Sequence, residues 1–490
     1  WDHDNNWDQG EALIYYSGGR VENVKLQSNY SAMYALLNQH LTVLNSLIQD
    51  NTSDGMFIAR WSDYATITDN TVLNSGNHGI WVGIDWTGHG PSGNATITGN
   101  TINGAVEGGI TFDASDIATI SNNNVSNVYG GGWSVGAISL KDGVSNVTVS
   151  GNTIHDNSAV GCPAWALPAS GRGIGIDGAS SNITLTGNQV YNNAGGGIKV
   201  EGTTGGVSAH DNCISGNLTF GANNTTGTVL NFVNNWWGAS NGPGGEGPGS
   251  GDYVSTNVDF DPWLTGLAYT GGLLFSNTTP IDLQATPSNS TNGVVGANVE
   301  FFVDDVSVGS ETTDGDGIAT KNIGTRPAGI YAVKAVAAGG CLTAKALIAV
   351  YDPNAGFVTG GGWINSPEGA YVGTTLTGKV TFGFVSKYQK GSKIPTGETE
   401  FQFKVADLNF KSTSYDWLVV SGPKATYKGL GKVNGGGNYG FLLSAIDGQL
   451  TSGGGTDKFR MKIVNKETDA VVYDNLLVGD DNADPTTEIG

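Results

Sequence analysis

Hydrophobic and polar residues alternate within one short phrase that the first half of the chain repeats. Its three clearest copies span residues 65–72, 95–102 and 118–125, and each carries an isoleucine flanked by threonine or serine, with an asparagine at the sixth position. Alternation with a period of two is typical of a half-buried strand. Each copy therefore predicts a short strand whose isoleucine faces a core.

Looser copies extend the series on both sides. The reference position recurs at intervals of 23 to 36 residues, at Ser46, Asn70, Asn100, Asn123, Asn152, Asn188, Asn212 and Asn235. A second strand is expected after glycine-containing turns, at 79–82, 109–112, 173–176 and 197–200. Repeats of this length without a helical pattern predict a parallel β-helix, which we place at residues 1–267. We expect the asparagines to stack as an amide ladder along one corner.

The rest of the chain predicts two further all-β units. Residues 268–354 are expected to form a linker and an immunoglobulin-like β-sandwich, with strands at 299–303, 306–308, 318–320, 331–335 and 346–350. Residues 355–490 are expected to form a C-terminal β-sandwich, with strands at 380–384, 401–405, 417–419, 439–443 and 459–463. Short alternating strands at regular spacing are typical of sandwiches. The predicted fold class is all-β throughout.

The composition agrees with a turn-rich all-β protein. The 490 residues include 77 glycines and only 14% charged residues. The net charge is -21, and residues 1–261 contain 6 Lys and Arg against 22 Asp and Glu. A rod this acidic is expected to repel nucleic acid and anionic polysaccharide. No apolar run is long enough to span a bilayer, and no signal peptide is visible.

Three cysteines allow more than one interpretation. Cys162, Cys213 and Cys341 have the spacing of neither a disulfide scaffold nor a zinc site. Cys162 and Cys213 could pair across neighbouring coils, which would leave Cys341 over. Alternatively, all three are small buried hydrophobic residues.

Glycosylation sequons are numerous in the predicted β-helix and linker. Asn-x-Ser/Thr occurs at Asn29, Asn51, Asn94, Asn124, Asn146, Asn182, Asn217, Asn223, Asn224, Asn277 and Asn289. Asn94, Asn146 and Asn182 each stand three residues before the first inward strand residue, which places them on one exposed corner. We expect some of these asparagines to carry glycans.

These motifs resemble known families. The repeats resemble the right-handed parallel β-helix repeats shared by pectate-lyase-like enzymes, phage tailspikes and many prokaryotic surface proteins, and 234–243 with 258–264 resembles the closing coil of such surface β-helices. The second unit resembles bacterial immunoglobulin-like repeats. Residues 360–364 with 415–417 resemble a C-terminal module of secreted prokaryotic proteins. The resemblance implies an extracellular protein, but a reaction has to be argued from a site.

No catalytic residue is assigned from the sequence. His89 and Lys199 superficially resemble polygalacturonase motifs, but they lie more than 100 residues apart and no Asp-Asp pair precedes His89. The basic residues between 41 and 267 are Arg60, Lys141, Arg172 and Lys199, and we expect no acidic cluster in matching register. Four acidic residues follow the second strand in successive coils, namely Asp113, Asp142, Asp177 and Glu201. They predict either a shallow carboxylate groove or solvated turns.

Other polar motifs fit turns better than ligand sites. The pairs His155-Asp156 and His210-Asp211 are interpreted as surface turns. Calcium-like spacing occurs at Asp314, Asp316, Asp480, Asp481 and Asp484. Calcium is the single cofactor considered, and hairpin and tail turns are the alternative because the EF-hand loop is absent.

The sequence favours a structural protein of the cell surface. We expect a subunit of a filament, sheath or surface layer that assembles as a homo-oligomer or polymer and contacts cell-surface glycans, with neither nucleic acid nor a membrane span. The alternative is a polysaccharide-binding or polysaccharide-cleaving protein that uses an aromatic face near Trp81, Trp86 and Trp133, or an adhesin.

Overall fold

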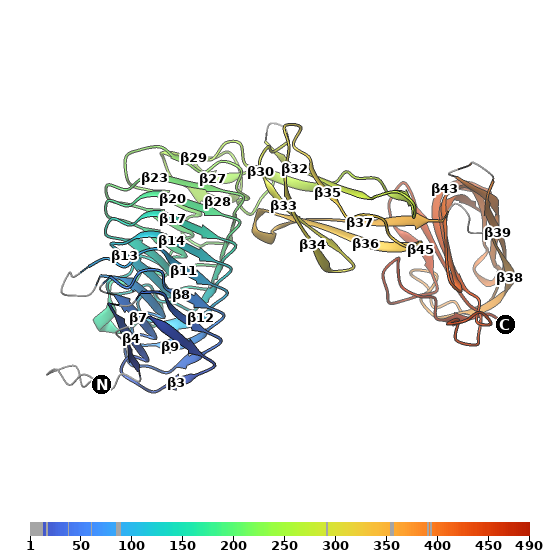
Figure 1. The fold of residues 1–490 in the computed structure, drawn as a ribbon. Helices are drawn as coiled ribbons and strands as arrows, with labels where there is room; N and C mark the ends of the chain where they lie inside the picture. Colours follow the sequence, from blue (N-terminus) through green and yellow to red (C-terminus); the bar gives the residue numbers. More distant parts are fainter. Residues whose placement is uncertain are drawn as a thin grey trace.

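The computed structural model describes residues 13–15 and 18–490, apart from 38, 60, 85–89, 291–292, 353–356, 390–391 and 393. A β-helix is followed by a middle module and a C-terminal module, which together extend the chain in one direction (Figure 1). The described residues form strands and three short 3-10 turns, η1 (Ala164–Ala166), η2 (Ala338–Gly340) and η3 (Lys404–Ala406), so the predicted all-β class is confirmed.

Three parallel sheets wrap the β-helix, and each regular coil contributes one strand to each of them. Sheet A contains, in spatial order, β1 (Leu13–Tyr15), β4 (Met33–Leu36), β7 (Met56–Ala59), β10 (Ile80–Gly83), β13 (Ile110–Asp113), β16 (Ile138–Lys141), β19 (Ile174–Ile176), β22 (Ile198–Val200), β25 (Ala222–Asn224), β28 (Gly251–Val254) and β27 (Pro243–Gly245). Sheet B contains β2 (Gly19–Glu22), β5 (Leu41–Leu44), β8 (Thr66–Thr68), β11 (Ala95–Thr98), β14 (Asp116–Ser121), β17 (Ser145–Ser150), β20 (Ser181–Thr186), β23 (Gly205–His210), β26 (Leu230–Asn231) and β29 (Val258–Asp259). Sheet C contains β3 (Lys25–Gln27), β6 (Leu47–Gln49), β9 (Thr71–Ser75), β12 (Thr101–Ala105), β15 (Asn124–Ser126), β18 (Thr153–His155), β21 (Gln189–Tyr191) and β24 (Cys213–Ser215).

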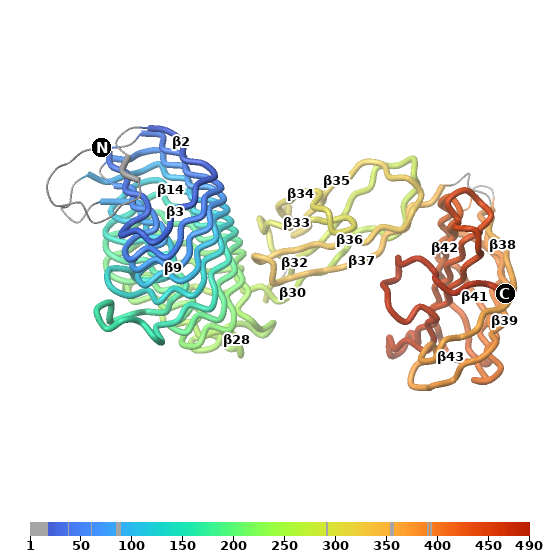
Figure 2. The backbone as a smooth tube through the Cα atoms, turned by 90° about the horizontal axis from the view of Figure 1, so that it is seen from below, coloured from blue at the N-terminus to red at the C-terminus, as the bar shows by residue number. Residues whose placement is uncertain are grey.

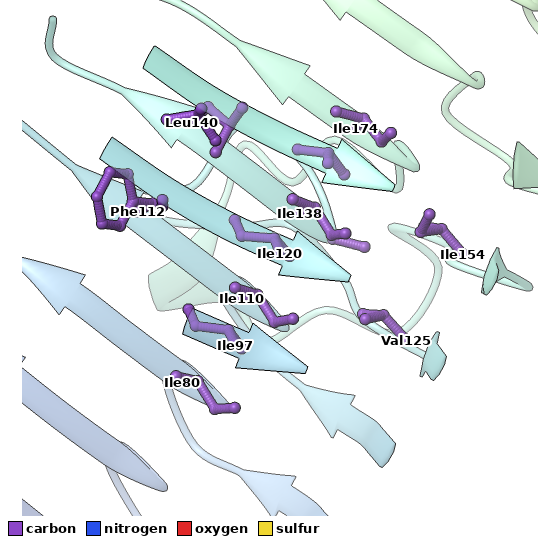
Figure 3. Packing of buried hydrophobic residues seen from close by; sticks show 14 of the residues in the cluster. Ile80, Ile97, Ile110, Phe112, Ile120, Val125, Ile138, Leu140, Ile154 and Ile174 are labelled. Atoms are coloured by element: carbon purple, nitrogen blue, oxygen red, sulfur yellow. The ribbon is translucent and has the colours of Figure 1, made fainter. Parts of the chain in front are cut away.

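The repeated phrase is the corner between sheets B and C. Its first strand lies in sheet B, its asparagine turns the chain, and its last residues lie in sheet C. Equivalent isoleucines pair in register from coil to coil, as Ile67 with Ile97 and Ile97 with Ile120. Their side chains are fully buried and stack along the axis (Figure 3). Burial of each such side chain contributes about 1.5–3 kcal/mol, so the stacked core stabilises every coil.

The asparagines form a continuous hydrogen-bonded ladder. Asn100, for example, donates its backbone N–H and its Nδ2 to Oδ1 of Asn123 at 2.9 Å, and Asn123 donates in the same way to Asn152. This pattern runs from Asn70 to Asn235. A second ladder, which the sequence analysis missed, links Asn157, Asn193, Asn217 and Asp252 at another corner.

The middle module consists of two sheets around one apolar cluster. The first contains β30 (Leu264–Tyr269), β32 (Asp282–Asn289) and β35 (Ala319–Asn322), and the second contains β31 (Leu274–Ser276), β37 (Leu342–Tyr351), β36 (Gly329–Ala337), β33 (Asn298–Val303) and β34 (Val306–Thr312). Because β30 pairs with β32, Leu264–Tyr269 belongs to this module. The immunoglobulin-like identity stays a prediction.

The C-terminal module is one continuous antiparallel sheet that curls around its own core, as the tube view shows (Figure 2). Its strands are β38 (Phe357–Ser366), β39 (Gly378–Tyr388), β40 (Pro395–Phe403), β41 (Leu408–Ser421), β42 (Lys424–Val433), β43 (Gly436–Ile446), β44 (Lys458–Asn465), β45 (Val471–Asp474) and β46 (Thr487–Glu488). The apolar faces expected of a sandwich are present, but the curl of a single sheet brings them together.

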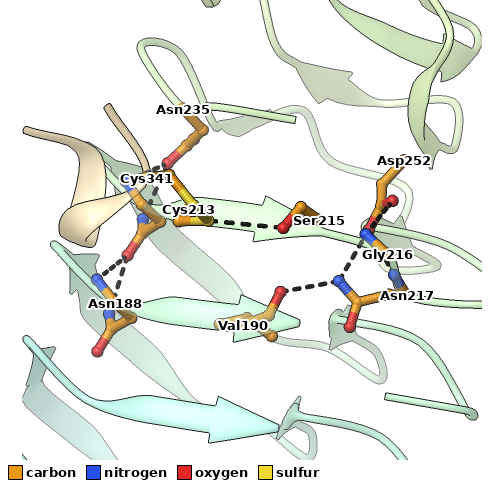
Figure 4. The surroundings of a disulfide bond; sticks show 10 residues. Asn188, Val190, Cys213, Ser215, Gly216, Asn217, Asn235, Asp252 and Cys341 are labelled. Carbon is orange, nitrogen blue, oxygen red and sulfur yellow. Dashed lines mark hydrogen bonds between the residues drawn. A yellow bond between two sulfur atoms is a disulfide. The ribbon is translucent and has the colours of Figure 1, made fainter. Parts of the chain in front are cut away.

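A disulfide fastens the middle module to the β-helix, which corrects both sequence interpretations of the cysteines. Cys213 of β24 is bonded to Cys341, which follows η2, and Cys162 is free (Figure 4). The η2 turn packs closely against the β-helix, since a Cβ added to Gly339 would lie 2.6 Å from the carbonyl oxygen of Asn188. The pairing joins residues 128 apart in sequence, so spacing within the β-helix could not have predicted it.

Candidate functional site on sheet A

Many outward side chains of sheet A are shielded from solvent, whereas the outer face of a half-buried sheet is normally exposed. Alternation should expose every second residue of a strand, yet every residue of β7, β13 and β16 is buried. In β13 and β16 the inward residues are aliphatic or aromatic, whereas the outward residues are Thr111, Asp113, Ser139 and Lys141. We call the outward side chains of β7 to β22 and the residues that directly follow these strands the sheet A face.

Asp113 and Lys141 form a buried ion pair at one edge of this face. They are paired in register, with Lys141 Nζ 3.6 Å from Asp113 Oδ2 and 2.5 Å from Asp142 Oδ2. Asp113 is 3% exposed and Lys141 is 8% exposed. Burial raises the pKa of Asp113 to about 6, although Lys141 opposes the rise. Oδ1 of Asp113 is buried without a hydrogen-bond partner.

Lys141 remains a cation in this setting. Its burial alone would lower the pKa of its ammonium group, but the carboxylates of Asp113 and Asp142 outweigh that effect and raise the pKa above its usual value. The pair therefore combines a carboxyl group that can hold a proton near neutral pH with a fixed positive charge.

The next coils continue the charged cluster. Burial, and then the charge of Asp142, raises the pKa of Asp177, whose Oδ1 is also buried without a partner. Arg172 Nη1 lies 3.2 Å from Glu201 Oε1, and Lys199 forms an ion pair with the same carboxylate. The expectation that the basic residues would lack an acidic cluster in matching register is therefore wrong.

A histidine between two carboxylates lies at the opposite edge of the face. His78 Nδ1 is 2.9 Å from Asp54 Oδ1, and its Nε2 is 3.2 Å from Glu107 Oε2. All three residues are buried. Burial raises the pKa of Glu107, and His78 opposes the rise. Sequence analysis missed this group, although Asp54 and His78 both stand two residues before the first inward residue of a sheet A strand.

The predicted aromatic face is only partly present. Trp81 packs against Phe57 and His78, each with ring centroids 4.5 Å apart, and its Nε1 is buried without a hydrogen-bond partner. Trp133 is 75% exposed on the loop after β15. Trp86 and His89 lie outside the described residues.

Several predicted glycosylation positions are inaccessible. Asn51, Asn217 and Asn224 are buried, and the amide nitrogens of the last two donate hydrogen bonds within the β-helix. Their burial argues against glycosylation of these three asparagines in the folded protein. The other sequons are exposed or partly exposed: Asn29, Asn94, Asn124, Asn146, Asn182, Asn223, Asn277 and Asn289.

The calcium candidates are used in turns and ion pairs. Asp314 Oδ1 accepts from the backbone of residues 316 and 318, while Asp481 and Asp484 pair with Lys462 and Lys424. Asp480 Oδ1 accepts from the backbone of residue 482. Asp316 is an exposed residue of the same turn as Asp314. Across the described residues, His, Cys, Asp and Glu form no group of three or more suited to holding a metal ion.

A hollow lies where the β-helix meets the middle module. Its volume is about 230 Å³, and its lining includes His210, Asp211, Asn231 and Val295. His210, the last residue of β23, has its Nδ1 3.0 Å from Oδ2 of Asp211, which is buried. His155 and Asp156 form a similar pair at 2.6 Å. The buried groups without partners described above lie on the sheet A face and not in this hollow, so we place the candidate site on that face.

Comparisons with known proteins agree with the β-helix. The family model described as a right handed beta helix region matches residues 83–237, and that of the periplasmic copper-binding protein NosD matches residues 3–129. No curated protein matches the chain. None of the helices in the described part is long and apolar enough to be a membrane span.

Similar solved structures include a periplasmic alginate epimerase, AlgG, in a double-mutant form (15% identity, TM-score 0.35, 44% of this chain and 49% of that one). Pectate lyase Pel9A is 11% identical with a TM-score of 0.33, over 53% of this chain and 66% of that one. The Dettilon tailspike protein is 12% identical with a TM-score of 0.36, over 96% of this chain and 71% of that one. This chain thus spans about half the length of the epimerase.

Proposed function

We propose that this chain is an extracytoplasmic polysaccharide-cleaving protein whose active site is the sheet A face. The observation that carries the proposal is the buried Asp113–Lys141 pair, in which Asp113 holds an unpartnered oxygen and has a pKa of about 6. The Cys213–Cys341 disulfide supports a compartment outside the cytoplasm, because disulfides persist in oxidising surroundings.

The energetic cost of this pair argues against a purely structural role. A buried polar atom without a partner costs about 1–3 kcal/mol, and a buried ion pair is often no more stabilising than apolar residues of similar volume. Neighbouring coils place the aromatic residues Phe57 and Trp81 on the outward face of the same sheet. The fold therefore accepts apolar side chains where it instead has Asp113 and Lys141. Unfavourable electrostatic interactions that are retained at one position of a fold are typical of functional sites.

The protonation states favour hydrolysis over elimination by a lysine base. With a pKa of about 6, Asp113 is protonated in part of the molecules near neutral pH and can donate a proton to a glycosidic oxygen as its C–O bond breaks. Water then adds to the anomeric carbon and gives its proton to a second carboxylate. Asp177, which also has a free buried oxygen, is our candidate for that base. Lys141 is too firmly protonated to act as a base.

The test is a panel of neutral and uronate polysaccharides. Reducing ends report hydrolysis, ultraviolet absorbance of unsaturated products reports elimination, and titration calorimetry reports binding. We expect Asp113→Asn to lower kcat about 100-fold or more, whereas Asp156→Asn, an exposed acid outside the site, leaves kcat unchanged. Full activity of Asp113→Asn, or a wild-type protein that neither binds nor cleaves any member of the panel, overturns the proposal.

The filament, sheath or surface-layer role expected from the sequence stays a prediction. Neither the described residues nor the comparisons support it, and the alternative drawn from the same sequence fits the sheet A face better. Self-assembly, an adhesin role and the cell surface as the specific location also stay predictions.

A further inference from the structure

A glycine-rich loop folds over the floor of the candidate site. Residues 130–136, between β15 and β16, contain four glycines, one tryptophan and no charge. Two of these residues touch floor side chains: the Val135 N–H donates to Ser139 Oγ at 3.1 Å, and the hydroxyls of Ser134 and Thr111 lie 3.1 Å apart. Because Thr111 and Ser139 belong to β13 and β16, the loop crosses the strands that carry Asp113 and Lys141.

The loop backbone is pressed against the sheet. A Cβ on Gly175, in the floor strand β19, would lie 2.2 Å from the carbonyl oxygen of Val135. A Cβ on Gly132, whose φ is +58°, would lie 2.3 Å from Glu107 Oε1. Glycine is needed at both positions, since any larger residue would push the loop away from the floor.

The loop is attached firmly at its start and weakly further along. The N–H groups of Gly131 and Gly132 donate to backbone carbonyls at 3.1 and 2.7 Å, whereas two attachments after them are long. The Trp133 N–H reaches Glu107 Oε2 at 3.4 Å, and Arg172 Nη1 reaches the carbonyl of Val135 at 3.5 Å. Both distances lie beyond the usual range of a protein hydrogen bond. Residues 133–136, which lie between Gly132 and the start of β16, can therefore separate from the sheet without disturbing the aliphatic core.

The loop also carries an aromatic side chain that the protein leaves in solvent. Trp133 is 75% exposed, although its backbone is anchored beside Glu107. An indole presents a flat apolar face with one polar edge, which suits the C–H face of a sugar ring whose hydroxyls point outward. Asp113, two residues after Thr111 on the same face of β13, is 3% exposed, so a substrate has to displace neighbouring groups before it can receive a proton.

We infer that Trp133 is a sugar-stacking residue, and that residues 133–136 of the loop lift from sheet A to admit a polysaccharide and close with Trp133 over a sugar ring. This inference rests on the proposed function and assigns a binding subsite to it. Trp133 binds and positions the chain, and proton transfer remains with Asp113.

The first experiment compares two exposed tryptophans. Trp133→Ala is expected to raise KM for long oligosaccharides at least tenfold with little change in kcat. Trp165→Ala is the matched control: Trp165 is 60% exposed in η1, on the neighbouring loop, and is expected to leave both constants unchanged. Equal kinetics for Trp133→Ala and wild type, with Asp113→Asn inactive, overturn the inference and leave the proposed function standing.

The second experiment locks the loop shut. Cysteines placed at Thr111 and Ser134, whose hydroxyls are 3.1 Å apart, should form a disulfide in a Cys162→Ala background. We expect oxidation of this variant to lower oligosaccharide turnover at least 100-fold and reductant to restore it, which also shows that the variant folds. The Cys162→Ala parent, treated alike, controls for reduction of Cys213–Cys341.

Two further outcomes complete the design. Hydrogen exchange of residues 130–136 should be slower in the oxidised variant, which shows that the disulfide has formed. If this variant nevertheless turns over oligosaccharide at the undiminished rate, the proposed loop movement is wrong. If the wild-type protein neither binds nor cleaves any polysaccharide, the proposed function fails and the inference fails with it.

Discussion

The asparagine ladder offers the sharpest test of what holds the β-helix together. Replacing Asn123 by alanine removes four hydrogen bonds, each 2.9 Å long. Oδ1 accepts the backbone N–H and the Nδ2 of Asn100, while Nδ2 donates to the Ile97 carbonyl and to Asn152. Each contributes about 1 kcal/mol net, so the free energy of unfolding should fall by about 4 kcal/mol.

Two comparisons isolate the ladder from the general loss of an amide. Asn103→Ala removes two longer hydrogen bonds, one donated to Ser126 Oγ at 3.2 Å and one accepted from Asn127 at 3.4 Å on the surface, and should cost about 1 kcal/mol. Asn123→Asp keeps the acceptors but loses both N–H donors and buries a charge, so it should be at least as damaging as alanine.

Equilibrium unfolding in guanidinium, followed by far-ultraviolet circular dichroism, measures these differences. Hydrogen exchange adds a local readout, because the Asn100 N–H loses its acceptor in Asn123→Ala and should exchange faster. A loss for Asn123→Ala no larger than that for Asn103→Ala, with unchanged exchange at Asn100, would refute the reasoning that the ladder stabilises the coils.

Three other predictions follow. The pKa of Asp113 is about 4 in the unfolded chain and about 6 in the folded protein, so the free energy of unfolding of the wild type should fall as pH rises from 4 to 6. Above pH 6, Asp113→Asn should be up to about 3 kcal/mol more stable than the wild type, measured by equilibrium unfolding at several pH values. Cys341→Ser should lower the free energy of unfolding by about 2–4 kcal/mol and broaden the distribution of interatomic distances derived from solution scattering, whereas Cys162→Ser should do neither. Peptide mapping of native material should find glycan on exposed Asn182 but never on buried Asn217.

Local patterns in the sequence were sufficient to predict the β-helix because each coil repeats the same arrangement of strands and turns. The inward isoleucine, the corner asparagine and the glycine turn recur together, and a period of two assigns each side chain to one face. The second ladder was missed although the sequence contains its signal, since Asn157, Asn193 and Asn217 each stand five residues after an asparagine of the first ladder. The disulfide was missed because its partners belong to different units.

The candidate site was harder to predict because it depends on register across coils. Asp113 and Lys141 are 28 positions apart, and only strand pairing brings their side chains to the same edge. The four acids after the second strand did indicate that edge. Their exposure differs, however, because Asp113 is buried, Asp177 and Glu201 are partly buried and Asp142 is exposed. The repeat does not encode these differences, so the sequence could not decide between a groove and solvated turns.

The structure separates what stabilises the coil from what acts on its surface. The isoleucine stacks and the ladder point inward, whereas the charged cluster projects outward from sheet A. In a solenoid, stability is close to a sum over neighbouring repeats, so well-packed coils can tolerate unfavourable electrostatics on one face. Neutralising Asp113 should therefore stabilise the protein while abolishing turnover, and truncating Asn123 should do the reverse, weakening the fold while leaving the chemistry of folded molecules intact. Opposite changes in stability and turnover at two positions of the same coil would be hard to reconcile with a β-helix that has a purely structural role.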